Sequence, residues 1–221
     1  VAVWGTNFVV IKLALGQMPP LLVATLRFAV AVVPAIFFFP RPQVPWRNLA
    51  AYGLLIGVGQ FGVMFVALNG HISPGLASLV IQIQVFFTIG LAMRLSGERL
   101  QGVQWLALAM ATAGIGIIVL HTDGSTTLLG LGLMLVAALA WAGGNIVSRQ
   151  AGQVNMVAYV VWSSLFAVPP LALLCLATEG WPAISAGVAG AGWGTWAAVA
   201  WQAGANALFG YAAWGWLLGR Y

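Results

Sequence analysis

The sequence has very little charge. Only 5% of its 221 residues are Asp, Glu, Lys or Arg, whereas 62% are hydrophobic. Soluble domains carry about 25% charged residues, so this chain could not cover the surface of a soluble globule. Its apolar runs are continuous and about twenty residues long, as in transmembrane helices, whereas the strands of a membrane β-barrel are shorter and alternate in polarity. The composition therefore predicts an all-α polytopic membrane protein.

Acidic residues are especially scarce, and none lies inside an apolar run. The three acids are Glu98, Asp123 and Glu179, and all fall in loops or at the ends of runs. A proton relay of membrane-embedded carboxylates is therefore not predicted. The two histidines, His71 and His121, also lie in loops, so no nucleophile, base or metal cluster is expected at membrane depth. We predict that the chain is not an enzyme and needs no metal or cofactor.

Clustered basic residues are also lacking. The formal net charge is +5, but the eight Lys and Arg residues are scattered singly along the chain. Binding to nucleic acid needs a basic patch, so nucleic acid is excluded as a partner. The one cysteine, Cys175, lies in an apolar run and has no second cysteine for an intrachain disulfide.

What the sequence does contain is eight apolar runs, separated by polar or helix-breaking segments, which predict eight transmembrane helices. They cover about 1–17, 21–39, 49–68, 74–94, 103–120, 128–148, 156–177 and 194–218. The first run begins at Val1 without an initiating Met or a signal-peptide pattern, so we expect the natural N-terminus to be missing.

The basic residues near the ends of the runs orient the predicted bundle. Arginines follow the second, fourth, sixth and eighth runs, whereas the loops after the third, fifth and seventh contain neither Lys nor Arg. Because Lys and Arg are retained on the cytoplasmic side, even-numbered spans are predicted to end in the cytoplasm. The N-terminus is then cytoplasmic.

An internal similarity relates the first and sixth runs. WGTNFVVIK at 4–12 resembles WAGGNIVSR at 141–149, at an offset of 137 positions. Trp and Asn are common in membrane helices, so chance similarity is the alternative. A repeat of five helices has an odd number of crossings, which makes the second copy run through the membrane in the opposite sense, as in many secondary transporters. We expect the first repeat over 1–120, with its first helix clipped, and the second over 128–221.

The order and spacing of several short motifs resemble one transporter family. The motifs are VWGTNFVVIK (3–12), MPPLLVATLRF (18–28), PAIFFFPRPQVP (34–45), PGLASLVIQIQVFFTI (74–89), GERL (97–100), WAGGNIVSR (141–149) and WGWLLGRY (214–221). With these motifs the chain resembles the EamA family of the drug/metabolite transporter superfamily. The similarity is closest to its O-acetylserine/cysteine exporter branch.

The resemblance implies a ten-helix inverted-repeat fold, of which about eight helices are present and helices nine and ten are missing. It also implies a secondary transporter of the bacterial inner membrane, which exports small amino-acid-like metabolites by alternating access. The expected partners are such a metabolite, as substrate, and membrane lipid. The alternatives are an exporter of another small metabolite or drug in the same superfamily and, from a different class, a membrane scaffold or receptor.

Two basic residues lie inside predicted spans and need an explanation. Arg27 lies about a third of the way into the second span, where a charge costs about 2.5–3.5 kcal/mol. It is a candidate counter-charge for a substrate carboxylate; bonding to neighbouring helix carbonyls, or snorkelling to the outer interface, is the alternative. Lys12 lies near the outer end of the first span, where snorkelling is easier, and is a weaker candidate.

Amide and indole side chains within the spans are further candidates for substrate binding. Asn7 and Asn145 must each bond either a substrate or a facing helix, because an unpaired polar group is costly in hydrocarbon. Trp4 and Trp141 are candidates for an aromatic cavity wall, with a place in the interfacial aromatic belts as the alternative.

Three more amides complete the candidate set. Gln82 and Gln84 are about 200° apart around a helix, so one is expected to face the transport path and the other a neighbouring helix. Asn206 follows Gln202 by four residues and precedes Gly210 by four, which places all three on one helix face. This polar and small stripe is a candidate lining of the path.

Overall fold

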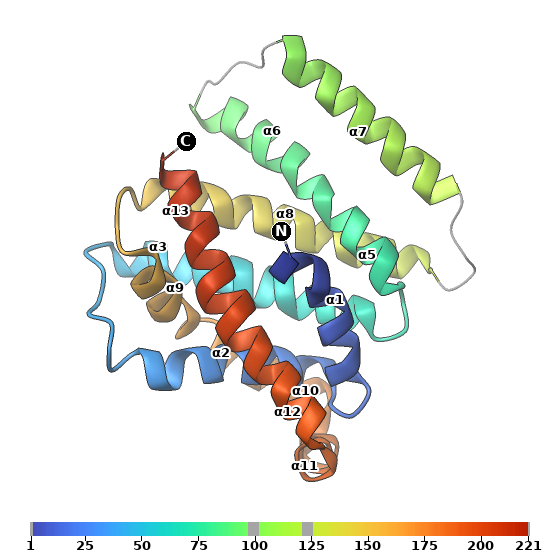
Figure 1. Cartoon of the computed structure of the whole chain (residues 1–221), viewed down its shortest axis with the longest axis vertical. Coiled ribbons are helices and arrows are strands. Elements are labelled where there is room, and N and C mark those ends of the chain that lie inside the picture. The colour runs from blue at the N-terminus through green and yellow to red at the C-terminus, as the bar shows by residue number, and fades with distance from the viewer. Residues whose placement is uncertain (1, 97–101, 121–125, 221) are drawn as a thin grey trace.

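Figure 1 shows the protein as a computed structural model, which describes residues 2–96, 102–120 and 126–220. Within these ranges all regular structure is helical, which confirms the predicted all-α class. Each predicted apolar run is covered by one stretch of helix, some of them divided into consecutive segments. The predictions about Glu98, His121 and Asp123, and the GERL motif, fall on residues outside the described ranges.

The helical stretches follow the order of the predicted runs. They are α1 (Ala2–Leu15), α2 (Pro20–Ala35), α3–η1–α4 (Trp46–Gly53, Leu54–Gly62, Val63–Leu68), α5–η2–α6 (Pro74–Val80, Ile81–Ile83, Gln84–Ser96), α7 (Gly102–Leu120), α8 (Leu128–Gln150), α9–α10 (Met156–Ser164, Val168–Thr178) and α12–η3–α13 (Trp193–Trp201, Gln202–Tyr211, Ala212–Arg220). A short additional helix, α11 (Gly180–Gly190), lies between the last two stretches.

Four of the described helices are long and apolar enough to cross a membrane individually. They contain 22 or 23 residues each, with a mean hydropathy of 1.7–2.0: Trp46–Leu68, Pro74–Leu95, Leu128–Gln150 and Met156–Thr178. α1 and α2 qualify only as a pair, bent by 119° at the break between them. Length and hydropathy therefore support four crossings, or five with the bent pair, and the count of eight stays a prediction.

Polar caps and prolines start several of the helices. The side chains of Ser73, Thr127 and Asn155 accept hydrogen bonds from first-turn backbone N–H groups of α5, α8 and α9. Such caps satisfy donors that have no partner within the helix. Pro20 and Pro74 occupy the first positions of α2 and α5, where a missing N–H costs nothing.

The turn between α1 and α2 is tied to a distant part of the chain. Glu179 accepts hydrogen bonds from the backbone N–H groups of Leu21 at 2.7 Å and Leu22 at 3.1 Å. A carboxylate at this position also interacts favourably with the positive end of the α2 dipole. Gln17 Oε1 accepts a hydrogen bond from the hydroxyl of Thr195 at the start of α12. These bonds join the first two helices to the second half of the chain.

α8 packs on two neighbouring stretches of helix, α3–η1–α4 and α5–η2–α6. α12–η3–α13 runs across the bundle and contacts α1, α2, α8 and α9 (Figure 1). Small residues allow the close approach, since a Cβ added at Gly144 of α8 would overlap the side chain of Ile56. The central helices are therefore packed too closely for larger side chains at such positions.

Large hydrophobic side chains cover much of the outer surface. Val9, Leu13, Val33, Phe37, Phe38, Trp105, Leu106, Met110, Ile117, Leu173 and Phe209 are each more than half exposed. Apolar patches of this kind are rare on soluble monomers but suit contact with lipid acyl chains. The exposed surface therefore supports a membrane protein, independently of helix length.

Candidate functional site

A cavity of about 360 Å³ lies among the central helices. Its walls come from α1, from η1 and α4, from α5 and η2, from α8 and from η3. The lining residues are Trp4, Gly5, Asn7, Phe8, Gln60, Phe61, Met64, Ser78, Ile81, Gln82, Trp141, Asn206 and Tyr211. Small-molecule sites occupy about 300–1,000 Å³ and combine apolar walls with a few polar groups, which this cavity does.

Arg27 is fully buried beside this cavity. Its Nη1 donates to Gln202 Oε1 at 3.2 Å and its Nη2 donates to Asn206 Oδ1 at 2.9 Å. Gln202 Nε2 donates in turn to Asn7 Oδ1 at 2.6 Å. Asn7 and Asn206 line the cavity, whereas Arg27 and Gln202 do not. This cavity network, as we call these four residues, therefore connects a buried cation to the cavity surface.

The charge of Arg27 is compensated without a protein carboxylate among the described residues. Its guanidinium carbon lies 3.4 Å from the centroid of the Phe61 ring and 4.9 Å from that of Phe28. Aromatic faces and amide oxygens both attract a cation, but neither carries the full negative charge of a carboxylate. An anion in the cavity would therefore gain from the nearby positive charge.

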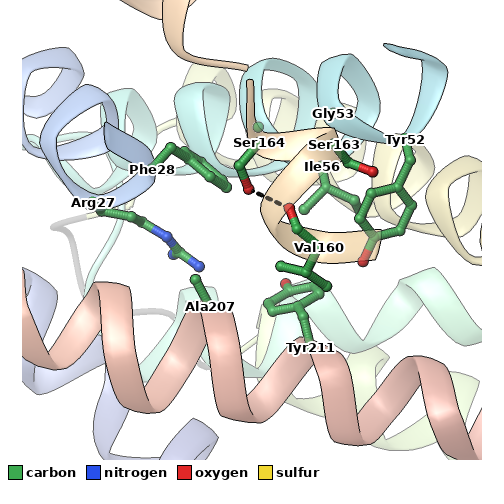
Figure 2. Close-up of a pocket in the computed structure, with 11 residues that line it drawn as sticks. Arg27, Phe28, Tyr52, Gly53, Ile56, Val160, Ser163, Ser164, Ala207 and Tyr211 are labelled. Atoms are coloured by element: carbon green, nitrogen blue, oxygen red, sulfur yellow. Dashed lines mark hydrogen bonds between the residues drawn. The ribbon is translucent and has the colours of Figure 1, made fainter. Parts of the chain in front are cut away.

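Arg27 also borders a second cavity, of only about 10 Å³ (Figure 2). Figure 2 shows Arg27 extending from α2 toward Ala207 of η3, with Ser163 and Ser164 on another wall. Both serine hydroxyls donate to carbonyls of their own helix, at 2.7 Å. About 10–15 Å³ is the smallest space that holds one water molecule, so of these two cavities the one of about 360 Å³ is large enough for a metabolite.

Much of the larger cavity wall is aromatic. The ring centroid of Trp4 lies 5.6 Å from those of Trp141 and Tyr211 and 5.5 Å from that of Trp214. Trp4 and Trp141, the two tryptophans of the internal similarity, therefore pack edge to face on one another and both border the cavity.

Gln60 and Tyr211 are cavity residues that the sequence patterns do not identify. Gln60 Nε2 donates to the Tyr211 hydroxyl at 2.8 Å. Gln60 stands in the middle of the third apolar run, and a polar residue in such a run is the signal that could have found it. Tyr211 has no comparable signal, because tyrosine is common in membrane helices.

Gln84 and Asn145 lie outside the cavity wall, in a second polar cluster. Asn145 Nδ2 donates to Gln84 Oε1 at 3.0 Å and to Thr88 Oγ1 at 3.3 Å. Trp214 Nε1 donates to Asn145 Oδ1 at 3.0 Å. We call these four residues the packing cluster, because their hydrogen bonds join α6, α8 and α13 to one another.

The structure therefore divides the predicted site residues into four groups. Trp4, Asn7, Gln82, Trp141 and Asn206 line the cavity. Arg27 reaches it through hydrogen bonds, whereas Gln84 and Asn145 bind each other. Gln82 and Gln84 diverge, as the angle between them predicts. Lys12 is exposed on α1 and does not border the cavity.

Metal-binding groups are not assembled in the described part of the chain, where no three His, Cys, Asp or Glu side chains lie close enough to hold an ion. The remaining features are a helical bundle, an apolar outer surface, membrane-length helices and a cavity lined by amides and aromatic rings. Together they define a polytopic membrane protein with an internal cavity of a size that suits a small molecule.

Comparison with known proteins identifies the family. Residues 1–120 match the sequence model of the EamA-like transporter family. The chain belongs to this family and is a multi-pass inner-membrane transporter. The resemblance in its motifs is therefore confirmed.

Two relatives are similar along the whole chain. Proteins named "Probable amino-acid metabolite efflux pump" from Salmonella typhimurium and Escherichia coli K12 are 41% and 40% identical over 227 and 229 residues, and the alignments cover 100% of this chain and 76% of each relative. The Escherichia coli K12 protein named "Uncharacterized inner membrane transporter YedA" is 30% identical over 172 residues, covering 71% of this chain and 55% of that one. A crystal structure with 21% identity matches the fold with a TM-score of 0.63, over 99% of this chain and 75% of that chain.

Proposed function

We propose that the protein exports small amino-acid-like metabolites, of the O-acetylserine and cysteine type, from the cytoplasm. The observation that carries this proposal is the cavity network, in which a buried arginine is bonded through amides to the wall of a metabolite-sized cavity. The names of the two relatives that align along the whole chain support the same class of substrate and the direction of transport.

The cavity network suits a carboxylate. Asn206 Oδ1 accepts from Arg27, and Asn7 Oδ1 accepts from Gln202. The NH₂ group of each asparagine is therefore the group left to donate into the cavity. A substrate carboxylate would accept from both amides, while the positive charge of Arg27 offsets its negative charge in a low-dielectric interior. Asn7 and Asn206 contact the substrate in this proposal, and Arg27 is a positioning residue.

Alternating access by two inverted repeats, 1–120 and 128–221, is part of the proposal. Two observations support it. Trp4 and Trp141 occupy equivalent repeat positions and meet in the cavity wall. The third and eighth helical stretches, which are also equivalent, each contain a π-helical segment, η1 and η3. Such segments are rare and often occur at functional sites.

We also propose a cytoplasmic N-terminus and no catalytic activity. The alternation of basic loops supports the orientation. The family and the relatives are transporters, which supports a role in moving a substrate rather than converting it.

The test is an export assay in cells that express the protein, compared with cells that carry the empty vector. We expect more O-acetylserine and cysteine in the medium, and Asn206→Leu at matched expression should reduce this release about tenfold or more, because a hydrogen bond to a charged group contributes about 1.5–3 kcal/mol. Release of a different metabolite, with neither of these two above the vector level, would show that the substrate is wrong. Release of no solute at all would favour a scaffold or receptor.

A further inference from the structure

Four buried polar atoms beside the cavity have no hydrogen-bond partner in the described structure. They are Arg27 Nε, Trp4 Nε1, Trp141 Nε1 and Gln60 Oε1. Three of these atoms are donors, and Gln60 Oε1 is the acceptor among them. Unsatisfied groups are rare in protein interiors, and a binding site that leaves them unpaired rejects ligands that cannot pair them. The acceptor is therefore informative about the ligand.

A hydrogen bond holds the amide nitrogen of Gln60, while its amide oxygen has no hydrogen-bond partner in the described structure. The residue is 2% exposed, and its Nε2 donates to the Tyr211 hydroxyl at 2.8 Å. The ring of Tyr211 is fixed in turn by Trp4 and Phe61, whose centroids each lie 5.6 Å from its own. Because Tyr211 occupies the amide nitrogen, the unpaired group of this cavity-lining residue is its oxygen, and only a hydrogen-bond donor can satisfy it.

The surroundings of this acceptor favour a positively charged donor over a neutral one. The rings of Trp4 and Tyr211 border the same cavity, and aromatic faces attract ammonium groups. Among the described residues the cavity wall contains no basic side chain that would repel a cation directly. Arg27 is bonded to Asn206 and stacks on Phe61, so a cation is disfavoured beside those two residues.

We propose that Gln60 Oε1 accepts a hydrogen bond from the substrate ammonium group, so that the cavity selects α-amino acids with a free amino group. This inference rests on the export function proposed above. The substrate carboxylate lies at Asn7 and Asn206, and the ammonium group lies between Gln60 and the rings of Trp4 and Tyr211.

The two ends of an α-amino acid are close together, and the structure places the two subsites on the same helices. Asn7 and Trp4 both belong to α1, and Asn206 and Tyr211 both belong to η3. Residues three to five positions apart on a helix lie within about one turn of one another. One small amino acid can therefore reach both subsites.

The experiment compares matched pairs of solutes in proteoliposomes containing the protein. O-acetylserine and N-acetylserine are isomers that differ in whether the amino group is free. Cysteine and 3-mercaptopropionate differ by the amino group alone, without added bulk. For the unaltered protein we expect transport of the free-amino member of each pair to be about tenfold faster or more at equal concentration.

Three variants locate the source of this preference. Gln60→Met removes the acceptor at similar size, and the preference should fall to about twofold or less. Tyr211→Phe removes the hydroxyl that holds the Gln60 amide nitrogen, so the amide can rotate and the preference should fall in part. Gln82→Met changes another cavity glutamine and should retain the preference, whatever its rate.

The outcomes separate this inference from the export function. Equal transport of both members of each pair by the unaltered protein would overturn the ammonium subsite while leaving export of amino-acid-like metabolites in place. This comparison needs no variant, so it stands even where Gln60→Met fails to insert. An unchanged preference for the free-amino solutes in Gln60→Met would also overturn the ammonium subsite. Transport of neither member of either pair would overturn both proposals.

Discussion

The two asparagines of the internal similarity have different environments, although their sequence contexts are alike. Asn7 lies in the cavity network, and Asn145 lies in the packing cluster. Asn7 follows Trp4 by three residues, whereas Asn145 follows Trp141 by four. One residue rotates a side chain by about 100° around a helix. The tryptophans both reach the cavity, but the extra residue turns Asn145 away from it and toward Gln84.

The packing cluster and the polar residues beside the cavity also differ in whether their hydrogen-bonding atoms have partners. In the packing cluster both functional atoms of the Asn145 amide are bonded to neighbouring helices. Beside the cavity, Arg27 Nε and Gln60 Oε1 have no partner in the described structure. A satisfied polar cluster stabilises one arrangement of helices, whereas unused donors and acceptors are available for a ligand. The comparison predicts that changes in one region affect stability and changes in the other affect transport.

Among these variants, Arg27→Met should reduce transport the most. We expect transport to fall about 100-fold, because the oxygens of Asn206 and Gln202 lose the donor that orients their amides, and the compensating positive charge is removed. Thermal stability should stay the same or rise, since an apolar side chain of similar length replaces a buried cation. Proteoliposome transport and a thermal melt in detergent measure the two effects. Arg27→Lys keeps the charge but lacks the planar guanidinium group, so its transport rate should lie between those of the wild type and Arg27→Met. Wild-type transport by Arg27→Met would remove Arg27 from the mechanism.

The same substitution at the two repeat-related asparagines tests the comparison directly. Asn145→Leu should lower stability by about 1–2 kcal/mol, because Trp214 Nε1 loses its acceptor, with KM changed less than about twofold. Asn7→Leu should raise KM about tenfold, with a smaller loss of stability. Each variant is the control for the other, and both need a transport assay and a melt. A larger rise in KM for Asn145→Leu than for Asn7→Leu would reverse the assignment of the two regions.

Thr88→Val should have a smaller effect within the packing cluster. Its hydroxyl accepts from Asn145 and donates to the Gln84 carbonyl oxygen at 2.8 Å. Valine has nearly the same shape, so only hydrogen bonds are lost, and we expect a destabilisation of about 0.5–1 kcal/mol. The measurement is unfolding in detergent, with Thr112→Val as the control, because Thr112 is exposed and bonds only to its own helix in the described structure. Equal changes in the free energy of unfolding for Thr88→Val and Thr112→Val would show that the packing cluster adds no stability.

Lys12→Gln should have the smallest effect. Lys12 is exposed, so its removal should change stability by less than about 0.5 kcal/mol and leave transport unchanged. A transport assay at matched expression checks this. A loss comparable with that of Arg27→Met would place Lys12 in the substrate path after all.

The helices could be predicted almost completely from the sequence, because apolar runs of membrane length are local features. The need of Arg27 for polar partners could be predicted as well, since a charge within an apolar run needs compensation from elsewhere in the fold. Its partners could not, because Gln202 and Asn206 lie more than 170 residues further along the chain. The orientation of the Gln60 amide could not be predicted for a similar reason: it depends on Tyr211, which is 151 positions away.

The sequence by itself determined the class of protein, the approximate positions of the apolar helical stretches, and the family. These properties depend on composition, on neighbouring residues and on the order of short motifs. Only the tertiary structure decided which of two similar asparagines reaches the cavity and which amides surround Arg27. It also decided that the amide oxygen of Gln60 has no hydrogen-bond partner in the described structure. Those properties depend on helix rotation and on contacts between distant segments. In a membrane, where nearly every residue of a helix is apolar, no local pattern marks the side that faces a substrate.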